Sequence, residues 1–364
     1  MLHDAFIDDL VTPRNQDSLR VASATASAGR RIVGYVGTDI PVELIVAANA
    51  LPVRLRGNAS MATPLADQYL ESAFLPETRA IAQQWLNGEL DFIDAVVFPR
   101  SSDSSQRLYY YLCELQRRKY CSGPVPLLYD LATIARNTSL DHTVNSTLQL
   151  ATALGVATTE LPRALTRVAQ RSALLGRMQT LRTQTTPLAG SIAFRVARAS
   201  ECDWSDSFDL ALAAWLDKPP TRAAGARILL AGSVPPDERL HLAVEAANGS
   251  IVADLFETQH SPSQAPHRDA TVTLAQRHHL AISPAQQMLR SSRWLASQAE
   301  KTRAQGVIVW LIEEDEALPW ELAAQISALR EANIPVLALT RERWLATDAL
   351  SKITNFVGSL TATP

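Results

Sequence analysis

A strand–helix–strand pattern that occurs twice is the feature that most constrains how this chain can fold. The first half contains four apolar, β-prone runs, at 31–36, 53–55, 92–98 and 125–129. The second half repeats this order roughly 200 residues later, with runs at 227–232, 251–254, 306–312 and 335–339. Segments with helical spacing separate the runs, which is typical of a parallel sheet covered by helices. We therefore expect an α/β fold with two parallel-sheet units and an internal duplication; the alternative is one continuous α/β domain.

Proline and capping residues mark the expected helix ends. Thr38 or Asp39 is placed to cap a helix that begins at Pro41, because the first turn of a helix has amide groups without partners. Leucine and alanine then recur at helical spacing until Pro52, which we expect to end that helix. In the second half, 284–300 indicates one further helix.

Strand signals vanish between the two halves. From 137 to 224, apolar residues recur at helical spacing, and prolines divide the stretch into successive helices. We therefore expect an N-terminal α/β domain at 1–136, a helical bridge at 137–224 and a C-terminal α/β domain at 225–364. The stretch 259–269 is polar and indicates a loop.

Charge, apolar run length and cysteine content exclude several classes of function. The chain has 34 basic and 37 acidic residues, and its net charge of −3 gives no electrostatic basis for nucleic-acid binding. No stretch approaches the roughly 18 uninterrupted apolar residues that cross a membrane, and the first residues lack a secretory pattern. An odd count of 3 cysteines is typical of reduced thiols. We expect a soluble, cytoplasmic protein.

The chain lacks the common nucleotide, serine-hydrolase and zinc motifs, so candidate site residues come from strand ends. The serine-rich run 101–105 opens a helix, where free amides favour an anion, or where the side chains only cap the helix. Asp103, facing the same cleft as Glu43, would form a carboxylate pair for acid–base work; the alternative is a cap or an ion pair. The candidate catalytic residues are therefore Glu43, Ser102 and Asp103. The candidate substrate-binding residues are Gly37, Thr38, Arg56, Ser102, Ser104 and Arg107.

Two further polar groups are weaker metal-site candidates. The acidic run 313–316 could bind a hard cation such as magnesium, but a solvated acidic loop explains it better. His278 and His279 are neighbours and point apart on a helix, so they are not expected to share a metal. We expect no metal site.

Four segments in a fixed order carry a family resemblance. They are 34–44 with 51–57, then 92–99 with 101–109, then 227–232 with 248–254, and finally 306–308 with 314–315 and 334–337. In this order they resemble the 2-hydroxyacyl-CoA dehydratase family of lyases, which also contains related benzoyl-CoA reductase subunits. The resemblance extends from residue 31 nearly to the end of the chain.

The resemblance implies two Rossmann-like domains with a helical region, and a homo- or heterodimer of related subunits. It also implies an acyl-CoA substrate and a 4Fe–4S cluster between the domains, bound by cysteine thiolates. In this family an ATP-driven activator supplies one electron, and the substrate thioester becomes a ketyl radical that expels its hydroxyl group.

The cluster-ligand positions hold other residues in this sequence. The cysteines of the family correspond to Gly37, to Ser102 in the triplet 102–104, and to Glu314 in the run 313–315. Glycine offers no ligand, and a hydroxyl or carboxylate is a poor substitute for a thiolate on iron. We therefore expect no cysteine-bound cluster.

Three hypotheses follow from this combination. The leading one is a dehydratase-like subunit that has lost its cluster and serves as a non-catalytic partner, or binds an acyl-CoA or small acid in the interdomain cleft. The second is an active dehydratase or reductase subunit with unusual cluster ligation. The third is a repurposed non-redox enzyme that uses Glu43, Asp103 or Ser102.

Overall fold

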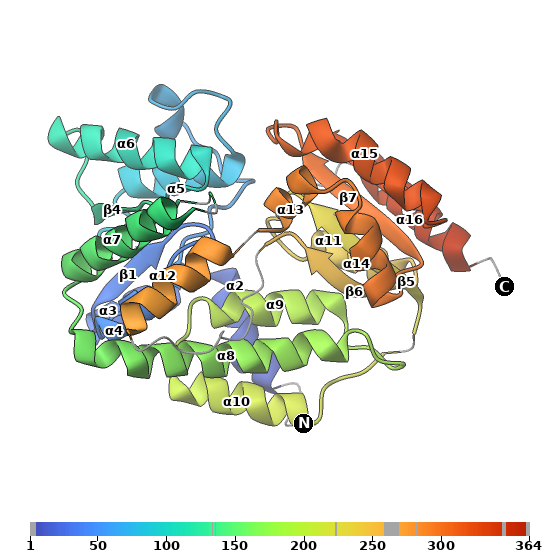
Figure 1. Ribbon diagram of the computed structural model, residues 1–364, viewed down its shortest axis with the longest axis horizontal. Coiled ribbons are helices and arrows are strands. Elements are labelled where there is room, and N and C mark those ends of the chain that lie inside the picture. The colour runs from blue at the N-terminus through green and yellow to red at the C-terminus, as the bar shows by residue number, and fades with distance from the viewer. Residues whose placement is uncertain are drawn as a thin grey trace.

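Two four-stranded parallel sheets form the two halves of the molecule (Figure 1). The computed structural model describes residues 5–132, 134, 136–222, 224–257, 269–281, 283–343 and 347–361. The N-terminal sheet has the strand order β2-β1-β3-β4, and the C-terminal sheet has the equivalent order β6-β5-β7-β8. The α/β fold with two Rossmann-like parallel-sheet units that the sequence predicts is therefore confirmed.

Both faces of the N-terminal sheet are buried. Its strands are β1 (Ile32–Tyr35), β2 (Leu51–Arg54), β3 (Ala95–Pro99) and β4 (Val125–Tyr129). Along β3, Val97 packs into one apolar cluster while Val96 and Phe98 pack into another, because successive side chains point to opposite faces. One cluster includes residues of α3 (Ser18–Ser27), α5 (Pro76–Leu86) and α6 (Asp103–Arg117). The other includes residues of α4 (Val42–Ala47), α7 (Asn137–Leu154) and α12 (Ala270–Leu280).

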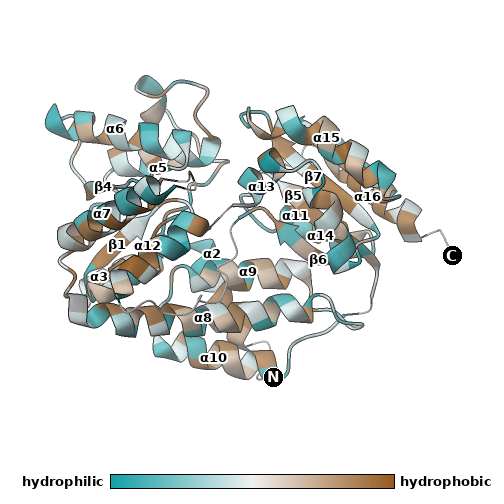
Figure 2. Ribbon diagram, in the orientation of Figure 1, coloured by the Kyte–Doolittle hydropathy of each residue, from teal (hydrophilic) through white to brown (hydrophobic). Residues whose placement is uncertain are grey.

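The C-terminal sheet follows the same plan. Its strands are β5 (Ala226–Gly232), β6 (Gly249–Leu255), β7 (Gly306–Ile312) and β8 (Val336–Glu342). Apolar residues of α11 (Arg239–Ala246) and α16 (Thr347–Thr361) pack on one face. Those of α13 (Pro284–Arg290), α14 (Trp294–Thr302) and α15 (Leu318–Glu331) pack on the other. Figure 2 shows that hydrophobic residues concentrate on the strands and on the helix sides that cover them.

Helices between the two sheets run along the base of both halves (Figure 1). They are α8 (Leu161–Leu181), α9 (Gly190–Ser200) and α10 (Asp206–Asp217). With the N-terminal element η1 (Phe6–Val11) they surround a separate apolar core that includes Phe6, Met178, Phe208 and Trp215. The short helix α2 (Thr12–Gln16) follows η1 and packs on α9. The later helix α12 returns from the C-terminal half to pack on α7 and α8. The chain therefore crosses between the halves more than once.

The first predicted helix differs from the structure at both ends. Pro41 itself is the N-cap residue of α4, so neither Thr38 nor Asp39 caps it, and the helix ends at Ala47. Pro52 lies inside β2, which is an edge strand. The amide of Leu51 donates to the carbonyl of Arg31, just before β1, and the amide of Leu55, just after β2, donates to the carbonyl of Tyr35 in β1. Proline is tolerated there because its missing amide hydrogen would point away from the sheet.

The single helix predicted over 284–300 is two helices, α13 and α14. The chain is extended at Ser291, which ends α13. The buried Gln325 side chain stabilises the break, because its Nε2 donates to the carbonyls of Met288 (2.8 Å) and Ser291 (2.7 Å). A buried amide side chain from α15 thus replaces hydrogen bonds that a continuous helix would make.

The predicted polar loop 259–269 lies outside the described residues except for Asp269. That residue accepts hydrogen bonds from the backbone amides of Thr271 (2.7 Å) and Val272 (3.3 Å) and so caps α12. Within the described part of the chain, no helix combines the length and apolar character that a bilayer crossing requires.

Candidate functional site

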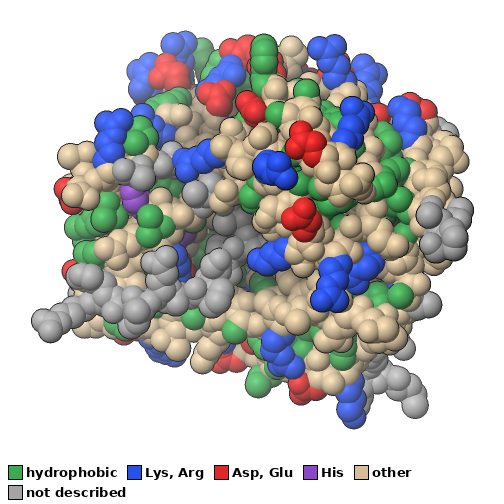
Figure 3. All heavy atoms as spheres, turned by 45° about the vertical axis from the view of Figure 1, so that its right-hand side comes forward, with side chains coloured by type: hydrophobic (Ala, Val, Ile, Leu, Met, Phe, Trp, Pro, Cys, Tyr) green, Lys and Arg blue, Asp and Glu red, His purple; other side chains and the backbone are tan. Residues whose placement is uncertain are grey.

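A cavity of about 400 Å³ lies where strand ends from both sheets face helices α8 and α9. Gly37 follows β1, Arg56 follows β2 and Glu257 follows β6, and all three line it. In open α/β sheets, ligands bind at the carboxyl ends of the strands. Figure 3 shows a hollow between the two halves, with several Lys or Arg side chains near it. The cavity therefore lies where this kind of fold binds small molecules, and its size falls in the usual range of roughly 300–1,000 Å³.

Helices α8 and α9 give the cavity an apolar wall. The apolar residues that they contribute are Val168, Leu175, Met178, Ala193, Phe194 and Ala197. Val42 at the start of α4 and the strand-end residues Val234 and Phe256 complete this wall. Such a wall favours the hydrocarbon part of a ligand, because binding there removes apolar surface from water.

Arg54 and Arg56 reach the cavity from the end of β2. Two residues apart on an extended chain, they project to the same side of the strand. The Arg54 side chain is only 5% exposed. Its backbone amide, which points away from β1, donates to the Glu201 carbonyl at 3.3 Å, so the edge of this sheet is tied to the end of α9.

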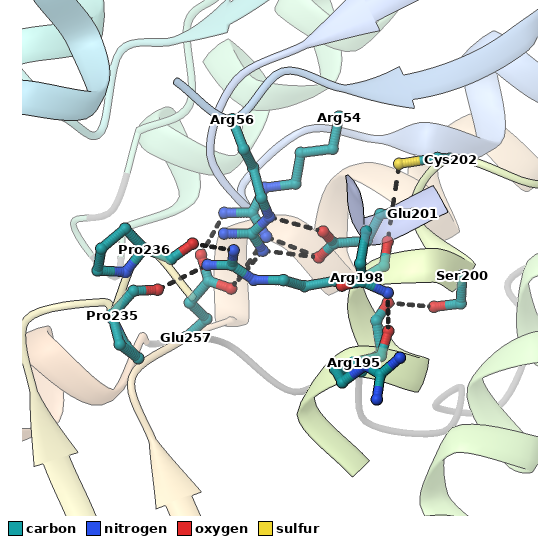
Figure 4. Close-up of polar contacts among 12 residues, drawn as sticks. Arg54, Arg56, Arg195, Arg198, Ser200, Glu201, Cys202, Pro235, Pro236 and Glu257 are labelled. Atoms are coloured by element: carbon teal, nitrogen blue, oxygen red, sulfur yellow. Dashed lines mark hydrogen bonds and ion pairs between the residues drawn. The ribbon is translucent and has the colours of Figure 1, made fainter. Parts of the chain in front are cut away.

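Glu201 and Glu257 hold both guanidinium groups (Figure 4). Arg54 Nη1 donates to Glu201 Oε1 (2.7 Å) and to Glu257 Oε2 (3.0 Å), and its Nη2 contacts Glu257 Oε1. Arg56 donates from Nε to Glu201 Oε2 (2.9 Å) and from Nη2 to Glu257 Oε2 (2.8 Å). Burial alone would raise the pKa of Glu257, but Arg54 and Arg56 outweigh it and hold that pKa well below its ordinary range. These four residues join the two halves of the molecule.

Arg198, on α9, brings a third guanidinium group to the same place (Figure 4). Its Nη2 donates to the Pro235 carbonyl (2.6 Å), its Nη1 contacts the Pro236 carbonyl, and the group lies 4.4 Å from the ring centroid of Phe194. Burial, and secondarily the charge of Arg56, lowers the pKa of Arg198 to about 10, so it stays charged at neutral pH. Among the described residues, no carboxylate forms an ion pair with it.

We call Arg54, Arg56, Arg198, Glu201 and Glu257 the arginine cluster. Its three guanidinium groups face two carboxylates, so it carries one excess positive charge. The other charged side chains on the cavity wall have opposite charges of their own: Glu43 pairs with Arg277, Asp254 with Arg182, and Arg171 with Asp209. Glu77 also acts on Arg56 and Arg198 at longer range. Arg198 is therefore the member of the cluster that has no ion-pair partner among the described residues, and it suits an anionic or strongly polar ligand group.

Glu43 is buried at the start of α4 and is held by α12. Its Oε1 contacts Arg277, and its Oε2 lies 3.8 Å from Nε2 of His278. Burial would raise the pKa of Glu43, but the nearby His278 and the charge of Arg277 outweigh it and lower that pKa to about 2. A carboxylate with so low a pKa is a weak base and is not a proton donor at neutral pH.

Asp254 is a second fixed carboxylate on the cavity wall. Its Oδ1 accepts from Arg182 Nη1 at 2.7 Å, and its Oδ2 lies 3.0 Å from His241 Nε2. Arg182 and His241 are both fully buried. Burial would raise the pKa of Asp254, but these two partners keep it well below its usual range.

The structure separates the predicted site residues into two groups. Gly37, Thr38, Glu43 and Arg56 line the cavity. Ser102, Asp103, Ser104 and Arg107 are not among its lining residues.

The predicted pairing of Glu43 with Asp103 is wrong, because these residues have different environments. Asp103 is 81% exposed in the first turn of α6 and lies 3.7 Å from Arg107 in an ion pair, whereas Glu43 is buried against α12. Ser102 is the N-cap residue of α6, and its hydroxyl accepts a hydrogen bond from the Ser105 amide at 3.4 Å. The serine-rich run therefore caps the helix, which is the alternative to anion binding given above. Arg107 pairs with Glu71 at 2.8 Å.

No cysteine thiol lines the cavity or occupies a position that the family resemblance assigns to a cluster ligand. Cys113 and Cys121 are partly exposed free thiols at or after α6, and none of the three cysteines lines the cavity. Cys202 is buried, its thiol donates to the Arg198 carbonyl (3.7 Å), and burial above all raises its pKa to about 12. Among the described residues, no group of three or more His, Cys, Asp or Glu side chains is arranged to hold a metal ion. The donors present do not fit a thiolate-bound cluster.

Sequence reasoning missed most of the arginine cluster. The position of Arg54 could have been predicted, because it comes two residues before Arg56 at a strand end and side chains two apart on a strand point to the same face. Arg198, Glu201 and Glu257 had none, since they come from a helix, a helix end and the other half of the chain.

Comparison with known proteins gives one family match. The model of the family described as "2-hydroxyglutaryl-CoA dehydratase, D-component" matches residues 38–351. No curated protein matches the chain. A solved structure titled "crystal structure of SsGBP and GDP complex" is similar at 12% identity and a TM-score of 0.24, covering 91% of this chain and 99% of that one.

Proposed function

Because the chain belongs to the 2-hydroxyglutaryl-CoA dehydratase D-component family, we propose that it is a dehydratase-type subunit without a cysteine-bound iron–sulfur cluster of its own. D-components of this family work with partner subunits, and we propose the same for this chain, with a related subunit as partner. Its interdomain cavity binds an acyl group or a small acid. The three free thiols support a reducing, cytoplasmic location.

The chemistry of the donors supports the proposed loss of the cluster. The cluster-ligand positions are occupied by Gly37, Ser102 and Glu314, and none of these is a soft thiolate donor. Gly37 has a φ of 73°, and a Cβ atom there would lie 3.3 Å from Pro99. A cysteine at this position would therefore need a strained backbone. The substitution of all three ligands argues against ordinary cluster chemistry in this chain.

The buried guanidinium group of Arg198, which lines the cavity and has no ion-pair partner among the described residues, is the observation that carries the binding proposal. A buried cation without a carboxylate partner is unfavourable unless an anion or a polar ligand group accompanies it. Apolar residues of α8 and α9 face the same cavity. An amphiphilic ligand with an anionic or strongly polar head and a hydrocarbon part matches both surfaces.

Iron analysis tests the proposal. The chain is purified without oxygen, alone and with its co-expressed partner subunit, and iron, acid-labile sulfide and visible absorption are measured. We expect neither iron nor sulfide in the isolated chain. Iron found only in the pair would support the partner-subunit role. Stoichiometric iron and sulfide in the isolated chain would overturn the proposal and favour unusual cluster ligation.

A further inference from the structure

We infer that Tyr35 is a specificity-determining residue of the cavity, and that its hydroxyl group, together with Nη1 of Arg56, binds an acyl oxygen of the ligand. The oxygen belongs to a carboxylate or to a carbonyl group, and the hydroxyl donates a hydrogen bond to it. This inference rests on the proposed function, because it names the residue that recognises the ligand of the same cavity.

The fold fixes the position of the Tyr35 side chain. Tyr35 is the last residue of β1, is only 5% exposed and lines the cavity. It belongs to the apolar cluster that also contains Ile40 and Val42, on the face of the sheet that α4 covers. A packed ring has little torsional freedom, so the hydroxyl is held in one place before a ligand arrives.

The Tyr35 hydroxyl is both unpaired and accessible. Within the described ranges it has no hydrogen-bond partner, yet its oxygen keeps accessible surface, whereas several guanidinium nitrogens of the arginine cluster are enclosed. Nη1 of Arg56 is in the same state, because Arg56 binds Glu201 and Glu257 through Nε and Nη2. Such groups bind water or a polar ligand atom, and a ligand oxygen reproduces the hydrogen bonds of the water that it displaces.

The chemistry of these groups selects an acceptor. A guanidinium group only donates hydrogen bonds. Burial above all, and then the charge of Glu201, raises the pKa of Tyr35 above its ordinary value, so its hydroxyl remains protonated at neutral pH and donates as well. The charged Arg198 lines the same cavity. A carboxylate or carbonyl oxygen accepts from these donors, whereas an ammonium group cannot accept and is repelled by the guanidinium groups.

The acyl oxygen is common to two kinds of ligand. A free acid presents it as a carboxylate, and a thioester presents it as a neutral carbonyl group. Both can place their hydrocarbon chain against the apolar residues of α8 and α9. The recognised chemistry is therefore the same, and titration with one ligand of each kind separates the two sources.

Calorimetric titration of the full chain identifies the head group. The probes are hexanoate, hexanoyl-CoA and hexylamine, which share a six-carbon chain and differ in the head. We expect hexanoate, hexanoyl-CoA or both to bind at least about tenfold more tightly than hexylamine. The tighter of the two acyl probes shows whether the ligand is a free acid or a thioester. Equal or tighter binding of hexylamine, or no binding of either acyl probe, would overturn the inference.

A single-atom substitution connects binding to the Tyr35 hydroxyl. Tyr35→Phe should weaken binding of the tighter acyl probe about fivefold to fiftyfold. The matched control is Tyr129→Phe. Tyr129 also ends a strand and is buried, but its hydroxyl lies 3.1 Å from Thr147 Oγ1 and it is not among the residues that line the cavity. Acyl affinity in Tyr129→Phe should stay within about twofold of the wild type.

Thermal melting of the ligand-free variants separates binding from folding. Tyr35→Phe deletes a hydroxyl that has no partner among the described residues, so its melting temperature should stay constant or rise slightly. Tyr129→Phe deletes a paired hydroxyl and should lower the melting temperature by roughly 1–3 °C. The two variants therefore differ in opposite directions in affinity and in stability.

Unchanged acyl affinity in Tyr35→Phe would overturn the inference, and a lowered melting temperature in the same variant would show that the hydroxyl serves the fold. In that case binding of an acyl probe to the wild type still supports the proposed function, so the two failures are distinguishable. The iron content of the chain is a readout that depends on neither variant.

Discussion

Several residues in this protein have a chemistry that their neighbours determine, and Glu43 is the clearest case. As a sequence position it is a candidate acid or base at a helix start. In the folded chain it is buried beside Arg277 and His278, which lower its pKa to about 2. The role that the structure supports for Glu43 is therefore that of a fixed negative charge that ties α4 to α12.

Glu43→Gln should destabilise the protein in a pH-dependent way. The folded pKa is below the ordinary value near 4.5, so the ion pair contributes stability above that value and loses it as the pH falls toward 2. At pH 7 we expect a free energy of unfolding roughly 1–3 kcal/mol below that of the wild type, since Arg277 is partly exposed. Urea denaturation at pH 7 and at pH 3 measures the difference. A difference that stays constant or grows at the lower pH would contradict this account.

Cys202 should be chemically inert in the folded protein. Burial raises its pKa to about 12, so almost no thiolate is present at pH 8. We expect iodoacetamide to alkylate the partly exposed Cys113 and Cys121 first, and Cys202 only after denaturation. Mass spectrometry of peptides after timed quenching gives the order. Labelling of Cys202 in native protein as fast as that of Cys121 would show that this thiol is accessible.

At the scale of elements, the sequence predicts strands better than helix ends. Each of the eight apolar runs overlaps a strand, because strands of a parallel sheet are buried on both faces and read as continuous apolar segments. Helix ends depend on tertiary contacts that no local pattern shows. Pro52 is tolerated in β2 only because β2 is an edge strand, and the break between α13 and α14 depends on Gln325 from a later helix.

Replacing Gly232 should destabilise the protein more than replacing Gly155, although both glycines have a positive φ. Gly232 ends β5 with a φ of 113°, and a Cβ atom there would lie 2.1 Å from the Trp310 carbonyl oxygen. Gly155 has a φ of 73°, but no atom lies within 4 Å of its Cβ position. Gly155→Ala should therefore cost only the backbone strain, about 1 kcal/mol, whereas Gly232→Ala should cost about 3 kcal/mol or more. Chemical denaturation of both variants tests this; equal losses would refute the steric argument.

At the scale of the molecule, the arginine cluster joins three parts of the chain. Arg54 and Arg56 come from the first sheet, Glu201 from the end of α9, and Glu257 from the end of β6. Sequence reasoning could place Arg56 at a cleft because strand ends meet there. It could not place the carboxylates, since their approach depends on how the two halves pack.

Glu201 and Glu257 should make coupled contributions to the free energy of unfolding. Each contacts both Arg54 and Arg56, so Glu201→Gln and Glu257→Gln remove partners of the same groups. We expect a double-mutant cycle at pH 7 to show a coupling free energy of about 1 kcal/mol or more. Glu114→Gln, which affects only exposed arginines on α6, is the control and should leave stability unchanged. Additive losses would contradict a shared network.

The central proposal is that this chain, a member of the dehydratase family, has no cysteine-bound cluster and binds a ligand in its cavity. The most direct measurement is the content of iron and acid-labile sulfide per chain, after oxygen-free purification and after an attempt to reconstitute a cluster with ferrous iron and sulfide. The account predicts that neither element remains bound after gel filtration and that the absorption near 400 nm characteristic of iron–sulfur clusters is absent. Stoichiometric iron and sulfide that survive gel filtration of the isolated chain would contradict it.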